Sequence, residues 1–168
     1  MFTVGLIGAG TVSARHIEAY KANKNCYLKS IADINEEQLH KRAADYKIEN
    51  AYTDYHKILA DNEIDAVAIV TPTFTHRDII IEALKSGKHV ICEKPPTRTA
   101  QEAIECHEAA KKYGKLLMYT FVSRFSAEVQ YLKKYAEAGK FGQIVCAEAA
   151  RLSRCSSCLL YTSPSPRD

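Results

Sequence analysis

The fold is decided near the N-terminus, by the stretch FTVGLIGAGTVS of residues 2–13. Its first half, residues 2–7, has the apolar and β-branched composition of a buried strand. Its second half, residues 8–13, is a glycine-rich turn that we expect to open a helix over residues 11–23. A strand joined to a helix by a tight turn is the first part of a βαβ unit.

The rest of the chain repeats this alternation. The apolar run of residues 66–70 has no polar alternation, as expected for a parallel strand that is covered on both faces. The pattern therefore predicts an α/β fold, a Rossmann-type doubly wound parallel sheet, over residues 1–120. Further strands are expected at residues 27–32, 89–92 and 116–120, and helices at residues 35–46, 54–60, 99–114 and 127–138, with one more helix ending at residue 87.

Two helix starts carry the spacing of a capping box. Asn35 is followed three residues later by Gln38, and Thr99 by Glu102. In such a box the first side chain caps the helix, and the fourth side chain reaches back to the start.

The C-terminal part departs from the pattern. Residues 121–151 are expected to hold a helix at residues 127–138 and one further strand at residues 143–151, where the chain leaves the parallel sheet. Residues 152–168 contain five serines and two prolines and have no periodicity. They are interpreted as a disordered tail or as translated adaptor sequence, and they are left out of the fold prediction.

Composition excludes several classes of protein. A chain of 168 residues buries enough surface to fold without disulfides or metal. A net charge of +3 without a basic run argues against a nucleic-acid partner, and no apolar stretch is long enough to span a membrane. The N-terminus lacks the features of a signal peptide, so we expect a cytoplasmic protein. Four cysteines are scattered singly, as reduced core thiols are, and the pair Cys155 and Cys158 lacks the second pair that a zinc site needs.

The glycine turn has the setting of a dinucleotide-binding turn. Gly8 allows the tight turn, and Gly10 lets the backbone approach a diphosphate. The helix that starts at Thr11 and Val12 offers free N–H groups and the positive end of its dipole. Ser13 stands where the fingerprint has Gly or Ala, which is a mild departure. Glycine turns without a ligand also occur.

Asp33 strengthens this interpretation. It lies 23 residues beyond Gly10, at the end of the second strand, where a carboxylate accepts both hydroxyls of an adenosine ribose. A carboxylate there also repels a 2′-phosphate, which favours NAD over NADP. The alternative is a turn or capping aspartate before Asn35.

Two further loops follow strands. TPTFTH, residues 71–76, comes after the most apolar strand, where open α/β sheets bind ligands. Its alternative interpretation is a loop with a capping Thr75 and a solvent-exposed His76. In the second loop, residues 93–95, Lys94 can reach the same crevice as a proton-transfer group, or it can be an ordinary solvated lysine.

Together these motifs resemble the Gfo/Idh/MocA family of oxidoreductases over residues 3–151. The matching stretches are GAGTVSARH, ADINEEQL, TPTFTH and CEKPPTRTAQEA, and FVSRF at residues 121–125 resembles the segment that leads to the family's second domain. Pro96 stands where many relatives carry Leu. The cofactor-binding residues that this reading gives are Gly8, Gly10, Thr11, Val12, Asp33, Thr71, Pro72, His76, Glu93 and Lys94.

The resemblance implies an NAD(P)-dependent oxidoreductase that moves a hydride between the nicotinamide and a CH–OH carbon of a sugar, inositol or related polyol. Lys94 would be the catalytic residue, and Lys94 and Arg124 would contact the substrate. On this resemblance, we expect residues 121–151 to hold a linker helix and only the first strand of a truncated second α+β domain. In the family that domain supplies the catalytic Asp and His, so we expect this polypeptide alone to be inactive. The full-length protein is expected to be a homo-oligomer.

Two alternatives remain. The first is a non-catalytic module that binds NAD. The second is an S-adenosylmethionine-dependent methyltransferase, which also uses a glycine turn and an acidic strand end, but which leaves the residue 71–76 and residue 93–95 loops unexplained.

Overall fold

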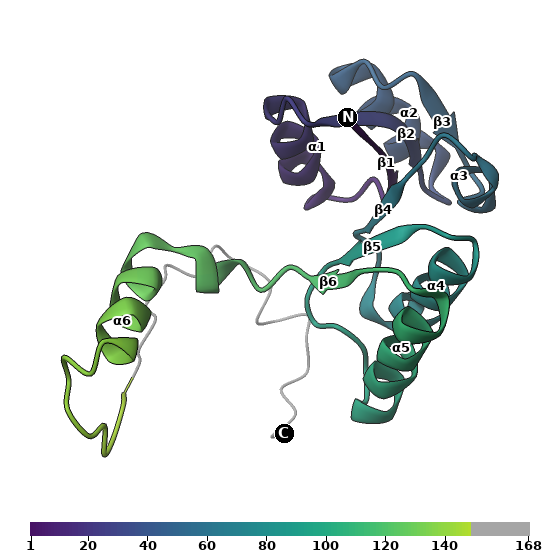
Figure 1. The fold of residues 1–168 in the computed structure, drawn as a ribbon. Coiled ribbons are helices and arrows are strands. Elements are labelled where there is room, and N and C mark those ends of the chain that lie inside the picture. The colour runs from purple at the N-terminus through teal and green to yellow at the C-terminus, as the bar shows by residue number, and fades with distance from the viewer. Residues whose placement is uncertain (149–168) are drawn as a thin grey trace, which may run out of the picture. The chain divides into compact units, whose positions relative to one another are not determined.

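The computed structural model describes residues 1–148 (Figure 1). The chain divides into two compact units, Met1–Val122 and a second that begins at Ser123.

The first unit is built on a six-stranded sheet with the order β3-β2-β1-β4-β5-β6 (Figure 1). All five neighbouring pairs are parallel, which confirms the predicted doubly wound α/β fold. Because the chain steps outward from β1 in one direction and then returns to its other side, the strand order reverses between β1 and β4. The strands are β1 (Phe2–Ile7), β2 (Cys26–Ala32), β3 (Asn50–Tyr52), β4 (Ala66–Ile69), β5 (His89–Cys92) and β6 (Leu117–Tyr119).

Helices cover both faces of this sheet and divide the core in two. Leu6 packs into one cluster with Ile17 and Leu39 of the helices, whereas its neighbour Ile7 packs into the other with Ile80. Successive side chains of a strand point to opposite faces, so a strand buried on both faces must be apolar throughout. The helices are α1 (Ser13–Ala22), α2 (Glu36–Tyr46), α3 (His56–Ala60), α4 (Thr73–Lys85) and α5 (Ala100–Tyr113).

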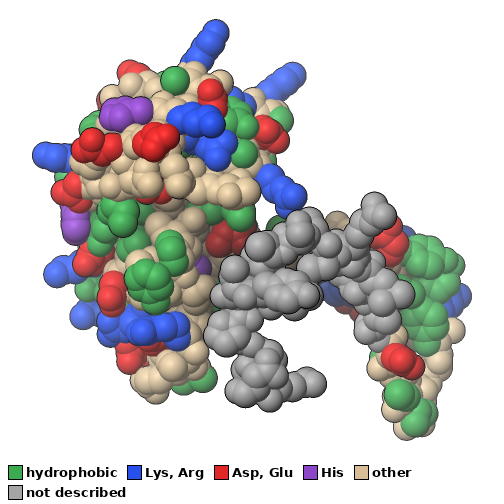
Figure 2. Space-filling model, turned by 180° about the vertical axis from the view of Figure 1, so that it is seen from behind, with side chains coloured by type: hydrophobic (Ala, Val, Ile, Leu, Met, Phe, Trp, Pro, Cys, Tyr) green, Lys and Arg blue, Asp and Glu red, His purple; other side chains and the backbone are tan. Residues whose placement is uncertain are grey.

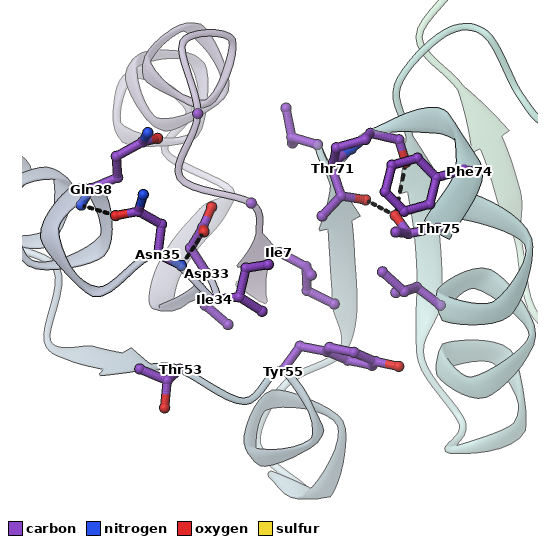
Figure 3. Close-up of a pocket in the computed structure, with 16 residues that line it drawn as sticks. Ile7, Asp33, Ile34, Asn35, Gln38, Thr53, Tyr55, Thr71, Phe74 and Thr75 are labelled. Carbon is purple, nitrogen blue, oxygen red and sulfur yellow. Dashed lines mark hydrogen bonds between the residues drawn. The ribbon is translucent and has the colours of Figure 1, made fainter.

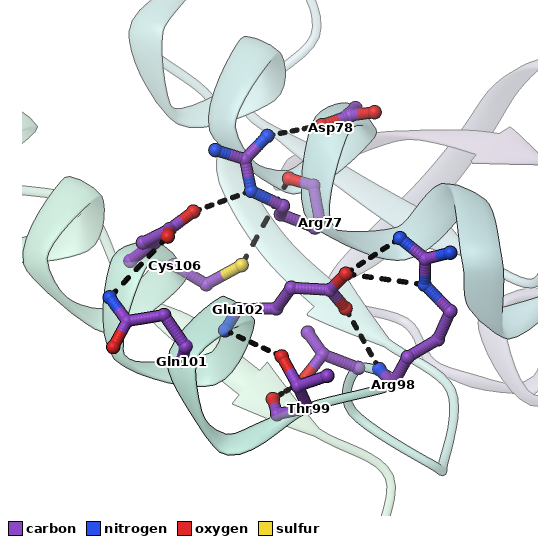
Figure 4. A network of polar contacts seen from close by, with 9 residues as sticks. Arg77, Asp78, Arg98, Thr99, Gln101, Glu102 and Cys106 are labelled. Carbon is purple, nitrogen blue, oxygen red and sulfur yellow. Dashed lines mark hydrogen bonds and ion pairs between the residues drawn. The ribbon is translucent and has the colours of Figure 1, made fainter.

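Both predicted N-caps form. The Asn35 side chain accepts a hydrogen bond from the backbone N–H of Gln38 at 3.0 Å, and that of Thr99 accepts one from Glu102 at 3.2 Å. The return bond at α5 differs from a regular capping box, because the Glu102 carboxylate accepts from the N–H of Arg98 at 2.9 Å and also pairs with its guanidinium (Figure 4). Cap and ion pair together define where α5 begins.

The sequence analysis did not predict the strand β3. β3 has three residues and its first is Asn50, so it lacks the length and the apolar run that mark a strand. It forms because its backbone pairs with the edge of β2.

A 3₁₀ turn, η1 (Val122–Phe125), begins at the last residue of the first unit, and the second unit holds α6 (Ala127–Glu137). The Ser126 side chain caps α6 by accepting from the N–H of Val129 at 3.4 Å. The strand predicted from residue 143 is wrong over residues 143–148, which are irregular. A strand needs a partner for its backbone groups, and the described residues offer none to this segment. Residues 149–151 and the predicted tail, with Cys155 and Cys158, lie outside the described residues.

The cysteines are less uniformly buried than expected. Cys92 and Cys106 are core thiols, whereas Cys26 is half-buried and Cys146 is exposed. All four are free. Within residues 1–148, no helix is long and apolar enough to cross a membrane, and no three acidic, His or Cys side chains converge as a metal site would require. On the face of the first unit seen in Figure 2, acidic and basic side chains are interspersed.

Candidate functional site

A cavity of about 470 Å³ opens at the carboxyl ends of β1, β2 and β4 (Figure 3). Its walls include Gly8, Gly10 and Asp33 on one side and Thr71, Pro72 and Phe74 on another. It lies at the point where the strand order reverses, which is where open α/β sheets bind ligands. Its size and largely apolar walls suit an organic ligand the size of a nucleoside.

The two glycines of the turn meet different demands. Gly8 has a φ of +109°, and a Cβ there would lie 2.7 Å from the backbone oxygen of Val70. The neighbouring backbone therefore excludes any side chain at Gly8. A Cβ on Gly10 would meet nothing within 4 Å, so this glycine borders open space.

The turn leaves several backbone donors without acceptors. The carbonyl of Gly10 accepts from both the N–H and the hydroxyl of Ser13, at 3.1 and 2.6 Å. Ser13, the residue that departs from the fingerprint, is fully buried and so strengthens the turn. Within residues 1–148, the N–H groups of Gly10, Thr11 and Val12 donate to no acceptor. Three such donors at the start of a helix form an anion-binding arrangement.

Asp33 faces the cavity with its carboxylate held by two backbone groups (Figure 3). Oδ2 accepts from the N–H of Ala9 at 2.6 Å, and Oδ1 accepts from the N–H of Asn35 at 2.8 Å. Asp33 therefore does stabilise the turn before Asn35, which was the alternative interpretation. That role leaves the ribose role possible, because each carboxylate oxygen has a second lone pair.

A second cavity of about 450 Å³ adjoins the first, since Val70 and Thr71 line both. Its other walls include Val12, His16, Glu93 and Lys94. The glycine turn, the residue 71–76 loop and the residue 93–95 loop thus border one continuous crevice along the strand ends. Such a crevice offers separate places to the two halves of a dinucleotide.

The sequence matches a known protein family over most of its length. The family model described as "Oxidoreductase family, NAD-binding Rossmann fold" matches residues 2–121. The chain belongs to the Gfo/Idh/MocA oxidoreductase family. The resemblance inferred from the four motifs is therefore confirmed, and the matched part is the family's NAD-binding domain.

Curated relatives and solved structures that resemble this chain include dehydrogenases. Levoglucosan dehydrogenase of Pseudarthrobacter phenanthrenivorans is 36% identical over 150 residues, which cover 84% of this chain and 38% of the relative. D-glucoside 3-dehydrogenase of Escherichia coli is 33% identical over 153 residues, which cover 90% of this chain and 44% of the relative. A structure of levoglucosan dehydrogenase in complex with NADH superimposes with a TM-score of 0.80 at 35% identity and covers 84% of this chain and 40% of that one. The chain spans about two fifths of the length of these members of the Gfo/Idh/MocA family.

Glu93 is held by a residue that the sequence analysis did not single out. Its Oε1 lies 2.9 Å from Nε2 of His16 on α1, and its Oε2 accepts from the N–H of Lys94 at 3.0 Å. Burial raises the pKa of Glu93, but the contact with His16 and the hydrogen bond from the Lys94 backbone counter it, and the pKa is lowered. Glu93 is thus an ionised anchor for the loop at neutral pH. The signal for His16 was its place at the end of GAGTVSARH, one helical turn beyond the glycine turn.

Lys94 is exposed at the second cavity. Within residues 1–148, its ammonium group has no hydrogen bond or ion pair. Its predicted role in substrate binding and proton transfer stays a prediction.

His76 differs from both sequence interpretations. Its side chain is 0% exposed, and it lines neither cavity, so it is neither a solvated histidine nor part of the crevice wall. Nε2 lies 2.9 Å from the carbonyl oxygen of Thr71, and Nδ1 lies 3.0 and 3.1 Å from those of Pro95 and Pro96. His76 therefore ties the two loops together from behind the crevice. The expectation that it lines the cofactor site is corrected accordingly.

Thr75 also acts within its loop. Its hydroxyl donates to the carbonyl of Pro72 at 2.8 Å and lies 2.7 Å from the hydroxyl of Thr71. Pro72, not Thr75, precedes the first residue of α4.

Arg124 lies in the second unit, where its carbonyl accepts from the side chain of Gln130. Its predicted contact with the substrate stays a prediction.

A polar group beside the first cavity supplies a pH-dependent prediction. Tyr55 lines the cavity and donates to Glu82 at 2.6 Å, and Glu82 also lies 3.2 Å from Nε2 of His56. The hydrogen bond to Asp54 raises the pKa of His56, despite the opposing effect of burial. A raised folded-state pKa stabilises the fold below the unfolded value of about 6.5, and this contribution is lost as pH rises through the folded value.

We expect His56→Gln to lower the free energy of unfolding more at pH 5.5 than at pH 8.5, when both proteins are unfolded in urea. His107→Gln, at another exposed histidine, is the control and should show the smaller pH dependence. An equal loss for His56→Gln at both pH values contradicts the assignment.

Proposed function

We infer that this chain binds NAD across the crevice, as the cofactor-binding part of a dehydrogenase that oxidises a hydroxyl of a sugar, inositol or related polyol. The observation that carries the proposal is the set of three N–H groups without acceptors at residues 10–12, together with the Asp33 carboxylate, which lines the same cavity as Gly10. These donors match a diphosphate, and the carboxylate matches a ribose. Family membership and the relatives named above support the same reaction class.

The preference for NAD over NADP rests on Asp33. A carboxylate at this position accepts bonds from the 2′- and 3′-hydroxyls of the adenosine ribose, but it repels a 2′-phosphate. Gln38, which lines the same side of the cavity, brings no positive charge to offset that repulsion.

We propose a separate role for each residue that borders the crevice. Thr71 and Pro72 would line the passage between the cavities, and Glu93 would hold its loop through His16 so that Lys94 faces the second cavity. In its neutral amine form, Lys94 would accept a hydrogen bond from the reacting hydroxyl and take up its proton, becoming an ammonium, as the C–H hydrogen leaves as hydride. Bound NAD supplies the hydride acceptor.

The proposed partners follow from this chemistry. The substrate is a small sugar or polyol, and we propose a cytoplasmic protein that has no nucleic-acid or membrane partner and whose full-length form is a homo-oligomer.

The test is a titration of the purified chain with NADH, followed by nicotinamide fluorescence, and a parallel titration with NADPH. We expect saturable binding of NADH and at least tenfold weaker binding of NADPH, in line with the loss of about 1.4 kcal/mol or more of binding free energy. Absence of NADH binding contradicts the proposal. Tighter binding of S-adenosylmethionine than of NADH would revive the methyltransferase interpretation. An assay for NADH formation with candidate polyols then separates a catalytic chain from one that only binds the cofactor.

A further inference from the structure

We propose that Arg42 is a positioning residue for the dinucleotide diphosphate: it orients the backbone donors of the glycine turn without lining the cavity. The proposal rests on the proposed function and assigns a role to a residue in which the sequence motifs indicate none. Arg42 lies in the middle of α2, 32 residues from Gly10 in the chain.

The contacts place its guanidinium on the outer side of the turn. Nε donates to the carbonyl oxygen of Ala9 at 3.4 Å, and Nη2 donates to that of Gly10 at 3.2 Å. The central guanidinium carbon also lies 5.9 Å from the centre of the Tyr46 ring. The side chain is half-buried between the turn and its own helix, so its direction is constrained.

These contacts set the direction of the donors on the other side. In a planar trans peptide, the C=O of one residue and the N–H of the next point in opposite directions. A guanidinium that holds the Ala9 oxygen therefore turns the Gly10 N–H away from α2, and the bond to the Gly10 oxygen does the same for the N–H of Thr11. These are two of the three N–H groups that have no acceptor within residues 1–148.

The two carbonyls do not depend equally on Arg42. The Gly10 oxygen is also held by the N–H and the hydroxyl of Ser13. The Ala9 oxygen accepts from Arg42 alone among the described residues. The Gly10 amide is therefore the donor that Arg42 controls most directly.

Charge adds to this geometry. The N-terminus of α1 already carries a partial positive charge, and the guanidinium places a full positive charge behind the same turn. A dinucleotide diphosphate carries two negative charges, whereas adenosine carries none. The effect of Arg42 is therefore specific to ligands that contain the diphosphate.

The experiment compares adenosine, ADP-ribose and NADH as ligands of Arg42→Met, Arg42→Lys and Lys41→Met by calorimetric titration. Arg42→Met is expected to lower the affinity for ADP-ribose and for NADH about tenfold. The affinity for adenosine should stay within about twofold of the wild-type value. Arg42→Lys keeps the charge but loses the two-point contact, so it should fall between Arg42→Met and the wild type. Lys41→Met removes an exposed charge from the same helix and should change none of the three affinities.

A second readout needs no ligand. In the ¹⁵N amide spectrum of the free chain, Arg42→Met should shift the Gly10 and Thr11 resonances, and Lys41→Met should not. The proposal is overturned by unchanged ADP-ribose affinity, by an equal loss for adenosine and ADP-ribose, or by unmoved Gly10 and Thr11 resonances. If the wild-type chain binds neither ADP-ribose nor NADH, the proposed function fails, and the amide spectrum still decides whether Arg42 orients the turn.

Discussion

Gly8→Ala is expected to cost about 3 kcal/mol of unfolding free energy, while Gly10→Ala leaves the fold intact and removes dinucleotide binding. At Gly8 two penalties add: a φ of +109°, and a Cβ 2.7 Å from a backbone oxygen that cannot move aside. At Gly10 neither penalty applies, because φ is not in the left-handed region and nothing lies within 4 Å of the added Cβ.

The two variants separate folding from binding. Urea denaturation should show a large fall in the midpoint for Gly8→Ala and a change within about 0.5 kcal/mol for Gly10→Ala. NADH titration should show at least a tenfold loss for Gly10→Ala, because the new methyl group occupies the space proposed for the diphosphate. Wild-type affinity in Gly10→Ala contradicts that placement, and wild-type stability in Gly8→Ala contradicts the steric account of the turn.

His76→Ala should be the second large effect, again of about 3 kcal/mol. The substitution empties a fully buried site and removes the two ring nitrogens, which lie within hydrogen-bond distance of the carbonyl oxygens of Thr71, Pro95 and Pro96. Because these carbonyls belong to two loops that border the crevice, NADH affinity should fall as well.

The matched control is His107→Ala, since His107 is exposed on α5. It should change the unfolding free energy by no more than about 0.5 kcal/mol. His76→Gln, which retains a donor and some of the volume, should lie between the wild type and His76→Ala. If His76→Ala unfolds at the wild-type urea concentration, the two loops do not depend on this histidine.

The sequence predicted the features that depend on interactions between residues close together in the chain. The caps at Asn35 and Thr99 depend on residues three positions apart, so the sequence shows them directly. The position of Asp33 at the cavity could also be predicted from the sequence, because the carboxyl ends of parallel strands meet at one edge of the sheet.

The parts that were missed depend on partners far apart in the chain. His16 and Glu93 are 77 residues apart, and His76 reaches Pro95 across 19 residues. No spacing rule links such residues before the sheet brings their loops together. The irregular residues 143–148 give the converse lesson, because a strand-like sequence forms no strand where the described chain provides no partner.

The most direct test of the central claim is the ¹⁵N amide spectrum of the chain during titration with NADH. The account predicts the largest shifts at the amides of Gly10, Thr11 and Val12, accompanied by Asp33 and saturating with the fluorescence titration. Shifts that spare residues 8–12 and gather at the separate cavity around Gly114 and Leu117, or no saturable shifts at all, would contradict it.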